Sequence, residues 1–284
     1  MNTRRLNTFD EQETVISENN SSDGYSFNPY QAYVFPDDVH VDWYKELGST
    51  NDLAIEYAKR DLKHSAVIVA DHQTCGKGRF DRIWHSPEGK GLWFSIVKPF
   101  EYDLANVPQV TLIAAVAVAE VLKNNTGLDI GIKWPNDLLI NNRKVCGILS
   151  ELAPGSDIDN VYVIVGIGIN VNMSSDDMSA EIKEKSTSLL MESGSELDRK
   201  KLLSDIIESF NKWFNIWLSN GFHEIREQWI KHNVTIGRML EVNLWDEYYC
   251  GQAVGMDQSG SLEILDSNNV VRKINSGEVS LIFN

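Results

Sequence analysis

Short runs of apolar and β-branched residues recur along the first 236 residues and predict buried strands. These runs lie at residues 39–47, 66–70, 92–97, 130–134, 146–152 and 161–171. Apolar residues at helical spacing predict helices that start at Ser49 or Thr50, at 104 and at 198, and that end near 62, 124 and 220. A shorter helix is expected to end near His232. This order of elements predicts an α+β fold, with a mixed or antiparallel sheet packed against helices.

The pattern changes after Arg238 to short alternating strands, expected at 239–244, 248–256, 262–265, 270–274 and 279–283. They predict a small antiparallel β-barrel. At the other end, residues 1–38 are polar and acidic, which predicts a flexible tail. We therefore expect a tail at 1–38, a main domain at 39–236 and a small C-terminal domain at 237–284.

Composition restricts the possible partners. The chain has 284 residues, 42% hydrophobic content and a net charge of −15. That charge argues against general nucleic-acid binding, which needs a basic surface. The cations gather instead at residues 77–90 and 133–144, where an anionic ligand is expected.

The chain shows no sign of export or of a membrane span. Three cysteines, Cys75, Cys146 and Cys250, do not have metal-ligand spacing and favour a reduced, cytosolic protein. The polar N-terminus does not resemble a signal peptide. The longest apolar run, 110–118, is much shorter than the roughly 20 residues of a membrane span.

A loop rich in glycine and cations joins the strands at 66–70 and 92–97. It contains Gly76, Gly78, Gly89 and Gly91 together with Lys77, Arg79, Arg82 and Lys90. Glycine permits close backbone approach to a ligand, and the cations supply donors for phosphate or carboxylate. An anion-binding lid and a solvated hairpin loop remain alternatives. A P-loop is excluded because the GxxxxGK[ST] spacing is missing.

Gly166 and Gly168 lie inside the strand predicted at 161–171. Glycine weakens a strand unless another group packs closely against its backbone. The GxGxxN spacing differs from the dinucleotide-binding GxGxxG, so a nicotinamide cofactor is not expected.

Three sequence blocks together resemble the biotin protein ligases. GKGRFDRIW (76–84) followed by SPEGKGLWFSIV (86–97) is similar to the GRGRxxRxW signature of that family. KWPND (133–137) leading to KVCGIL (144–149), and VGIGIN (165–170), are similar to two further family blocks. They occur in the family's order, and the resemblance covers about residues 40–284. It implies a biotin/lipoate ligase-like catalytic domain with a Src-homology-3-like C-terminal barrel.

The resemblance implies a two-step reaction. ATP and biotin, with Mg²⁺, give biotinyl-5′-AMP and pyrophosphate, and a lysine of a biotin carboxyl carrier domain then takes up the biotin. The resemblance implies a cytoplasmic enzyme without membrane partners. A nucleic-acid partner is not expected either, because no N-terminal helix-turn-helix is apparent. A homodimer and the identity of the metal ligands stay open.

The matching positions imply site residues. Lys133 and Arg79 are the expected catalytic residues, with Lys133 bridging the biotin carboxylate and the α-phosphate. The expected biotin-binding residues are Ser49, Thr50, Asn51, Gln73, Lys77, Gly78, Arg79, Trp84, Lys133 and Gly147. The expected ATP-binding residues are Arg79, Arg82, Trp84, Asn136, Asp137, Lys144 and Asn170. Ser49 and Thr50 have a simpler alternative role as helix caps.

The chain departs from the family in three respects. Lys77 replaces the first arginine of the signature and lacks its planar fork. Asp81 stands where glycine or asparagine is common, and an ion pair with Arg79 or Lys90 is expected. No tryptophan lies between 186 and 198 to stack on adenine.

Two other functions compete with a biotin ligase. A lipoate–protein ligase would share the fold and the chemistry. A biotin-sensing regulator or a binding protein without activity belongs to a different class. The cations at Lys133, Arg79 and Arg82 argue against an inactive binder, and the acidic N-terminal segment argues against a regulator.

Overall fold

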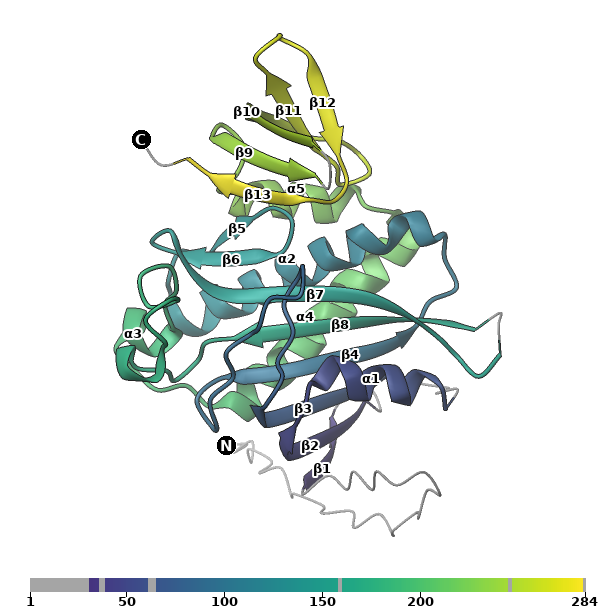
Figure 1. Ribbon diagram of the computed structural model, residues 1–284. Coiled ribbons are helices and arrows are strands. Elements are labelled where there is room, and N and C mark those ends of the chain that lie inside the picture. Colours follow the sequence, from purple (N-terminus) through teal and green to yellow (C-terminus); the bar gives the residue numbers. More distant parts are fainter. Residues whose placement is uncertain (1–30, 36–38, 61–64, 158–159, 245–246, 283–284) are drawn as a thin grey trace, which may run out of the picture.

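The fold is built on a large mixed sheet of eight strands (Figure 1). The computed structural model describes residues 31–35, 39–60, 65–157, 160–244 and 247–282. The strand order is β1-β2-β3-β4-β8-β7-β6-β5, and only the β2–β3 pair is parallel. The strands are β1 (Gln31–Phe35), β2 (Val39–Leu47), β3 (Ala66–Gln73), β4 (Leu92–Pro99), β5 (Gly131–Lys133), β6 (Asp137–Ile140), β7 (Arg143–Pro154) and β8 (Val161–Ile169).

Helices cover both faces of this sheet. The α-helices are α1 (Thr50–Ala58), α2 (Val107–Thr126), α3 (Leu189–Ser193), α4 (Arg199–Asn220) and α5 (His223–His232), and short 3₁₀ turns lie at Leu104–Asn106 and Ser175–Asp177. In Figure 1, α1 lies in front of the sheet, and α2 and α4 lie behind it. The strand alternation explains this arrangement, since Val67 and Val69 join the core with α2 and α4, whereas Ile68 and Ala70 join the core with α1.

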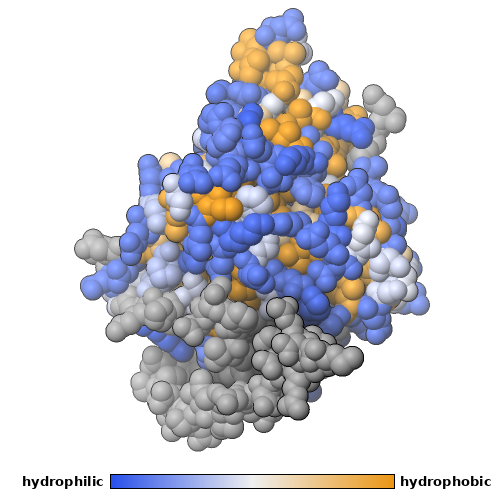
Figure 2. Space-filling view, turned by 180° about the vertical axis from the view of Figure 1, so that it is seen from behind, coloured by the Kyte–Doolittle hydropathy of each residue, from blue (hydrophilic) through white to orange (hydrophobic). Residues whose placement is uncertain are grey.

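A second, five-stranded antiparallel sheet follows α5 and lies at the top of Figure 1. Its order is β12-β11-β10-β9-β13, with β9 (Met239–Leu244), β10 (Glu247–Met256), β11 (Leu262–Asp266), β12 (Val271–Ile274) and β13 (Glu278–Leu281). Val254, Val270 and Val271 are exposed. Figure 2 shows hydrophobic residues at the surface near the top of an otherwise mostly hydrophilic face. The small sheet therefore buries its apolar residues less completely than the large one.

Local chemistry explains where elements begin and end. Asn141 and Asn142 both have positive φ, 51° and 62°, and form the predicted two-residue turn between β6 and β7. The Asp198 side chain accepts hydrogen bonds from the backbone N–H groups of Lys200 and Lys201 and so caps α4. Gly221, with φ 75°, ends that helix as predicted.

The α+β prediction is confirmed, with two differences in the extent of elements. The sequence predicts a tail at residues 31–35, but they form β1 and pair antiparallel with β2. Their segment, QAYVF, is the least polar part of the predicted tail, and it completes an otherwise open sheet edge. The first helix ends at Ala58 rather than near 62. The rest of the predicted tail, 1–30 and 36–38, lies outside the described residues.

One helical segment in the described part of the chain, Leu104–Thr126, is long and apolar enough to cross a membrane by length and composition. This segment is longer than the apolar run at 110–118, because the 3₁₀ turn at Leu104–Asn106 continues directly into α2. Its residues from Val110 to Leu122 are mostly buried between the sheet and α4. The helix is thus a core element of this fold.

Candidate active site

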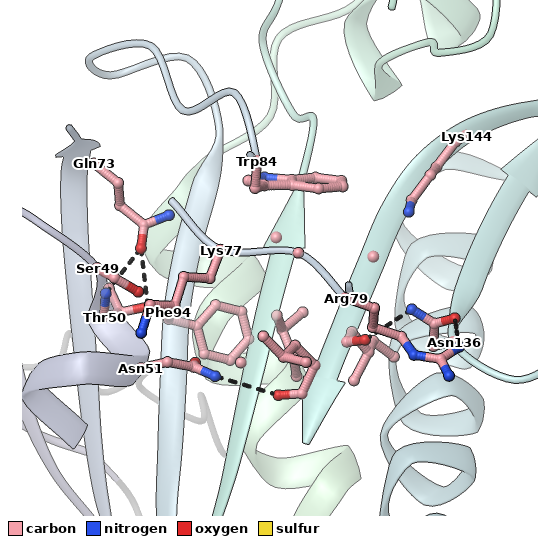
Figure 3. Close-up of a pocket in the computed structure, with 17 residues that line it drawn as sticks. Ser49, Thr50, Asn51, Gln73, Lys77, Arg79, Trp84, Phe94, Asn136 and Lys144 are labelled. Carbon is pink, nitrogen blue, oxygen red and sulfur yellow. Dashed lines mark hydrogen bonds between the residues drawn. The ribbon is translucent and has the colours of Figure 1, made fainter. Parts of the chain in front are cut away.

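Two adjoining pockets open on the α1 side of the sheet. The first has about 450 Å³ of empty space, open solvent included, and lies between the start of α1, the end of β3, the 76–84 loop and the middle of β7 and β8. Its lining residues are Ser49, Thr50, Asn51, Gln73, Lys77, Gly78, Arg79, Trp84, Phe94, Asn136, Lys144, Gly147, Ile148, Leu149, Gly166, Ile167 and Gly168. Figure 3 shows the α1 residues and Gln73 on one side, Arg79 and Asn136 on the other, and the Trp84 ring between them.

The second pocket has about 890 Å³ of empty space, open solvent included, and reaches the C-terminal sheet. It is lined by Gly78, Arg79, Phe80, Arg82, Ile83, Trp84, His85, Lys133, Trp134, Pro135, Asn136, Asp137, Lys144, Asn170, Ile182, Ser186, Glu278 and Val279. Lysine and arginine side chains are concentrated here, so this pocket suits a ligand with several negative charges.

The wall shared by the two pockets contains Arg79, Trp84, Asn136 and Lys144. The Arg79 Nη1 donates to Asn136 Oδ1 at 3.2 Å, and Asn136 Nδ2 donates to the Ile148 carbonyl at 3.0 Å. Burial lowers the pKa of Arg79, although the carboxylates of Asp137 and Glu278 oppose that shift. The Lys144 Nζ lies 5.1 Å from the centre of the Trp84 ring. Two cationic side chains therefore stand where the ligands of both pockets would meet.

Asp137 holds the two lysines of the second pocket. Its carboxylate lies 2.6 Å from Lys144 Nζ and 3.6 Å from Lys133 Nζ. Lys144 lines both pockets, whereas Lys133 lines only the second. An anionic ligand in the second pocket would compete with Asp137 for both ammonium groups.

The polar residues of the first pocket form a connected network. Gln73 Oε1 accepts from the Thr50 backbone N–H at 2.8 Å and from its hydroxyl at 3.2 Å, and Gln73 Nε2 donates to Ser86 Oγ at 3.0 Å. Ser49 occupies the N-cap of α1, but its hydroxyl makes no capping hydrogen bond. Ser49 therefore caps the helix by its position only, and its hydroxyl is available to a ligand.

The Asn51 amide is fixed by two residues behind the pocket. Asn51 Nδ2 donates to Glu151 Oε2 at 2.6 Å, and the Ser95 hydroxyl lies 2.6 Å from Asn51 Oδ1. Because a carboxylate only accepts hydrogen bonds, Glu151 orients the Asn51 amide so that its nitrogen faces the carboxylate. Ser95 and Glu151 were not identified from the sequence, where Ser95 is one polar residue in the apolar start of a strand and Glu151 follows another polar residue, Ser150.

Glycines make the space for these side chains, as the sequence predicted for the GIGIN block. A Cβ at Gly166 would lie 2.1 Å from Asn51 Oδ1, and one at Gly168 would lie 2.5 Å from Trp84 Nε1. At Gly147 a Cβ would lie 2.9 Å from Trp84 Cζ3. The side chains of Asn51 and Trp84 thus pack directly on the backbone of β7 and β8.

The 76–84 loop is a tight hairpin rather than an open loop. Gly78 N–H donates to the Arg82 carbonyl at 2.7 Å, and Trp84 N–H donates to the Gly76 carbonyl at 2.8 Å. Lys77 pairs with Asp52 of α1, and this hydrogen bond raises the lysine pKa. At the other end Arg82 pairs with Glu278 of β13. Closure of this loop as a lid stays a prediction.

Asp81 and Phe80 form the turn of this hairpin, with φ values of 57° and 56°. Asp tolerates the left-handed region better than most residues, which accounts for glycine, asparagine or aspartate at position 81. The expected ion pair of Asp81 with Arg79 or Lys90 is wrong: Arg79 contacts Asn136, and Lys90 lies 3.7 Å from Asp177. Backbone conformation, rather than charge, explains this departure.

The structure brings the sequence-derived candidates together. All the expected biotin-binding residues except Lys133 line the first pocket. All the expected ATP-binding residues line the second. The lining residues that the sequence did not predict include Phe94 in the first pocket and Ile182, Glu278 and Val279 in the second, because nothing in their local pattern distinguishes them from core or surface residues.

Metal-ligand chemistry is sparse in this site. The described residues contain no group of three or more histidine, cysteine, aspartate or glutamate side chains placed to hold a metal ion. Asp137 is a carboxylate in the second pocket, and it already pairs with two lysines. Such a pocket fits Mg²⁺ that arrives bound to phosphates and water, as Mg²⁺ usually does.

Comparison with known proteins identifies the family. Residues 44–170 match the model of the biotin/lipoate A/B protein ligase family. The chain is 37% identical over 243 residues to the bifunctional ligase/repressor BirA of Bacillus subtilis, covering 85% of this chain and 74% of that protein. It is 32% identical to the biotin–[acetyl-CoA-carboxylase] ligase of Paracoccus denitrificans, covering 75% of this chain and 89% of that one.

A solved structure supports the same assignment. The biotin protein ligase from Aquifex aeolicus in complex with biotin and ATP superposes with a TM-score of 0.75 at 32% identity, covering 86% of this chain and 99% of that chain. Sequence blocks, fold and adjoining pockets therefore agree, and this chain belongs to the biotin protein ligases of the biotin/lipoate ligase family.

Proposed function

We propose that the protein activates biotin with ATP to biotinyl-5′-AMP and then transfers the biotin to a lysine of a biotin carboxyl carrier domain. The observation that supports this most directly is the pair of pockets with a shared cationic wall. The first pocket takes biotin, with the ureido group facing Ser49, Asn51 and Gln73. The second takes ATP, and the biotin carboxylate meets the α-phosphate at the shared wall.

The first step joins two anions, so its main barrier is electrostatic. Fixed cations at the point of contact lower that barrier without reorganising during the reaction. Arg79 is held by Asn136, and Lys144 lies over Trp84, so both are positioned before the ligands bind. When bound, Mg²⁺ supplies further neutralisation of the phosphates. We assign Arg82 and Lys133 to the phosphates of ATP, and Asn136, Asp137 and Asn170 to orienting the nucleotide.

Lys144 replaces Lys133 as the residue proposed to bridge the biotin carboxylate and the α-phosphate. Only a side chain that reaches both pockets can contact both reacting groups. Lys144 lines both, and Lys133 does not line the first. The sequence favoured Lys133 because Pro135 follows it, but β5 directs that lysine to the nucleotide side.

The other expectations complete the proposal. Residues 39–236, extended by β1, form the catalytic domain, and 237–284 form a small domain whose five strands close as a Src-homology-3-like barrel. The enzyme is cytoplasmic and binds no nucleic acid. The net charge of −15 and the free cysteines support these two points. Gel filtration coupled to light scattering at micromolar concentration distinguishes a homodimer from a monomer.

Pyrophosphate exchange into ATP tests the activity. Purified protein with ATP, Mg²⁺ and biotin should exchange labelled pyrophosphate, and lipoate in place of biotin should not support exchange. The hydrogen-bonding groups around Ser49 and Gln73 match a ureido ring, which a dithiolane ring cannot replace. Exchange with lipoate but not with biotin would support the proposed adenylation step and contradict biotin as the substrate. No exchange with either acid would favour a binding protein.

Glu151→Leu should weaken biotin binding about fivefold, because Asn51 loses the acceptor that orients its amide. Titration calorimetry with biotin alone measures this effect. Glu151→Gln is the matched control, since its amide oxygen still accepts from Asn51 Nδ2. Equal affinities for the wild type and the leucine variant would show that Glu151 does not position Asn51.

A further inference from the structure

We propose that Thr235, in the segment joining α5 to the C-terminal sheet, is a positioning residue for the nucleotide pocket. It fixes the turn between Lys133 and Asp137 by accepting a hydrogen bond from the Trp134 backbone. This inference rests on the proposed function, because it assigns the second pocket to ATP.

The joining segment docks on the edge of the large sheet through an isolated β-bridge. β5, at that edge, has only three residues. Asn233 forms a parallel bridge with Ile132, and the Val234 N–H donates to the Ile132 carbonyl at 3.1 Å. A Cβ at Gly131 would lie 2.4 Å from Val234 Cγ1, so the glycine makes room for this approach. The segment thereby covers a short strand edge that would otherwise be open.

Asn233 sets the conformation of this segment. Its Oδ1 accepts from the backbone N–H groups of Thr235 at 2.7 Å and Ile236 at 2.8 Å. This is the local turn that asparagine side chains favour. It presents the Thr235 hydroxyl toward the end of β5.

Thr235 then holds the residue that follows Lys133. The Trp134 backbone N–H donates to Thr235 Oγ1 at 2.9 Å, and Thr235 is fully buried. At its other end, Trp134 Nε1 donates to the Gly260 carbonyl of the β10–β11 turn at 3.1 Å. The joining segment therefore fixes the backbone of Trp134, and the small sheet fixes its indole ring.

The position of Trp134 determines the position of the nucleotide groups beside it. Lys133 precedes Trp134, and Asn136 and Asp137 follow within three residues; all three line the second pocket. Loss of the Thr235 acceptor would leave a buried N–H without a partner and loosen this turn. The polar contacts of Ser49, Thr50 and Gln73 do not pass through it, and only Asn136 of this turn lines the first pocket, so biotin binding should weaken less than ATP binding.

Kinetics of three variants test the inference. Thr235→Val and Thr235→Ala remove the acceptor, the first with unchanged shape and the second with less bulk, and Thr235→Ser keeps it. We expect KM for ATP to rise about fivefold in the valine and alanine variants and to stay near the wild-type value in the serine variant. The Kd for biotin alone should change less than KM for ATP, because Asn136 is the one residue of this turn that lines the first pocket. Thr111→Val, which removes a part-buried hydroxyl bonded to Ser150, is the control for a general loss of stability.

The outcomes separate the two proposals. An unchanged KM for ATP in the valine and alanine variants would overturn the role of Thr235. An equal weakening of biotin and ATP binding, or the same changes in Thr111→Val, would also overturn it by showing a general structural effect. If the wild type does not exchange pyrophosphate, the proposed function fails instead. Direct titration with a fluorescent ATP analogue still compares Thr235 variants in that case.

Discussion

Lys144→Ala should lower the rate of biotin-dependent pyrophosphate exchange on the order of 10²- to 10³-fold. The side chain lines both pockets and lies 2.6 Å from Asp137 and 5.1 Å from the centre of the Trp84 ring. Its loss removes a cation from the place where carboxylate and α-phosphate meet. It also leaves the Asp137 carboxylate paired with Lys133 alone. The negative charge of Asp137 is then less compensated and repels the triphosphate of ATP.

Lys133→Ala distinguishes a bridging lysine from a phosphate-binding one. Because Lys133 lines only the second pocket, its loss should raise KM for ATP and lower kcat less than the loss of Lys144 does. Lys201→Ala, which removes an exposed lysine paired with Asp205 on α4, is the control for loss of a charge. Exchange at near wild-type rates in Lys144→Ala, with a large loss in Lys133→Ala, would restore the assignment made from sequence.

The sequence predicted the elements of the fold well because hydrophobic periodicity is a local property. Strand β2 and the hairpin turn at Asn141 and Asn142 were located correctly from alternation and turn chemistry. β1 was missed, because QAYVF is short and lies in a polar surrounding, and its pairing with β2 is a contact with a later part of the chain. The shape of the C-terminal sheet likewise depends on packing that a strand pattern does not contain.

The sequence predicted the site residues that lie in recognisable family blocks. It did not predict residues outside those blocks that position the site residues. Gln73 and Arg79 lie in or beside a signature block, and both line the first pocket. Ser95, Glu151 and Thr235 act through other side chains or the backbone, and each is far in sequence from its partner. Such residues have no local signal, because their role comes from the fold that brings strands and linker together.

The division of work between Lys133 and Lys144 shows the same limit. Both are lysines near a turn in one family block, and sequence cannot tell whether β5 or β7, which have β6 between them, carries the lysine that faces the shared wall. The bulge between Leu138 and Leu139 shifts the β6–β7 register just before that wall. A one-residue difference in register changes which face a side chain lies on, so this assignment needed the structure.

Gly166→Ala should weaken biotin binding about 10- to 100-fold while the protein stays folded and binds ATP. The added Cβ would lie 2.1 Å from Asn51 Oδ1 and 2.8 Å from Asn51 Cγ. Asn51 cannot move aside without cost, since Glu151 and Ser95 hold its amide. The methyl group therefore displaces a side chain that lines the biotin pocket, and titration calorimetry with biotin measures the result.

Gly48→Ala is the matched control for this substitution. Gly48 precedes Ser49 without lining either pocket, and a Cβ there meets nothing within 4 Å. It should bind biotin like the wild type. Because the ATP-side cations approach from β5, β7 and the 76–84 loop, Gly166→Ala should leave the affinity for ATP alone unchanged. Wild-type biotin affinity in Gly166→Ala would contradict the placement of biotin against Asn51, and a parallel loss of ATP binding would show damage to the sheet instead.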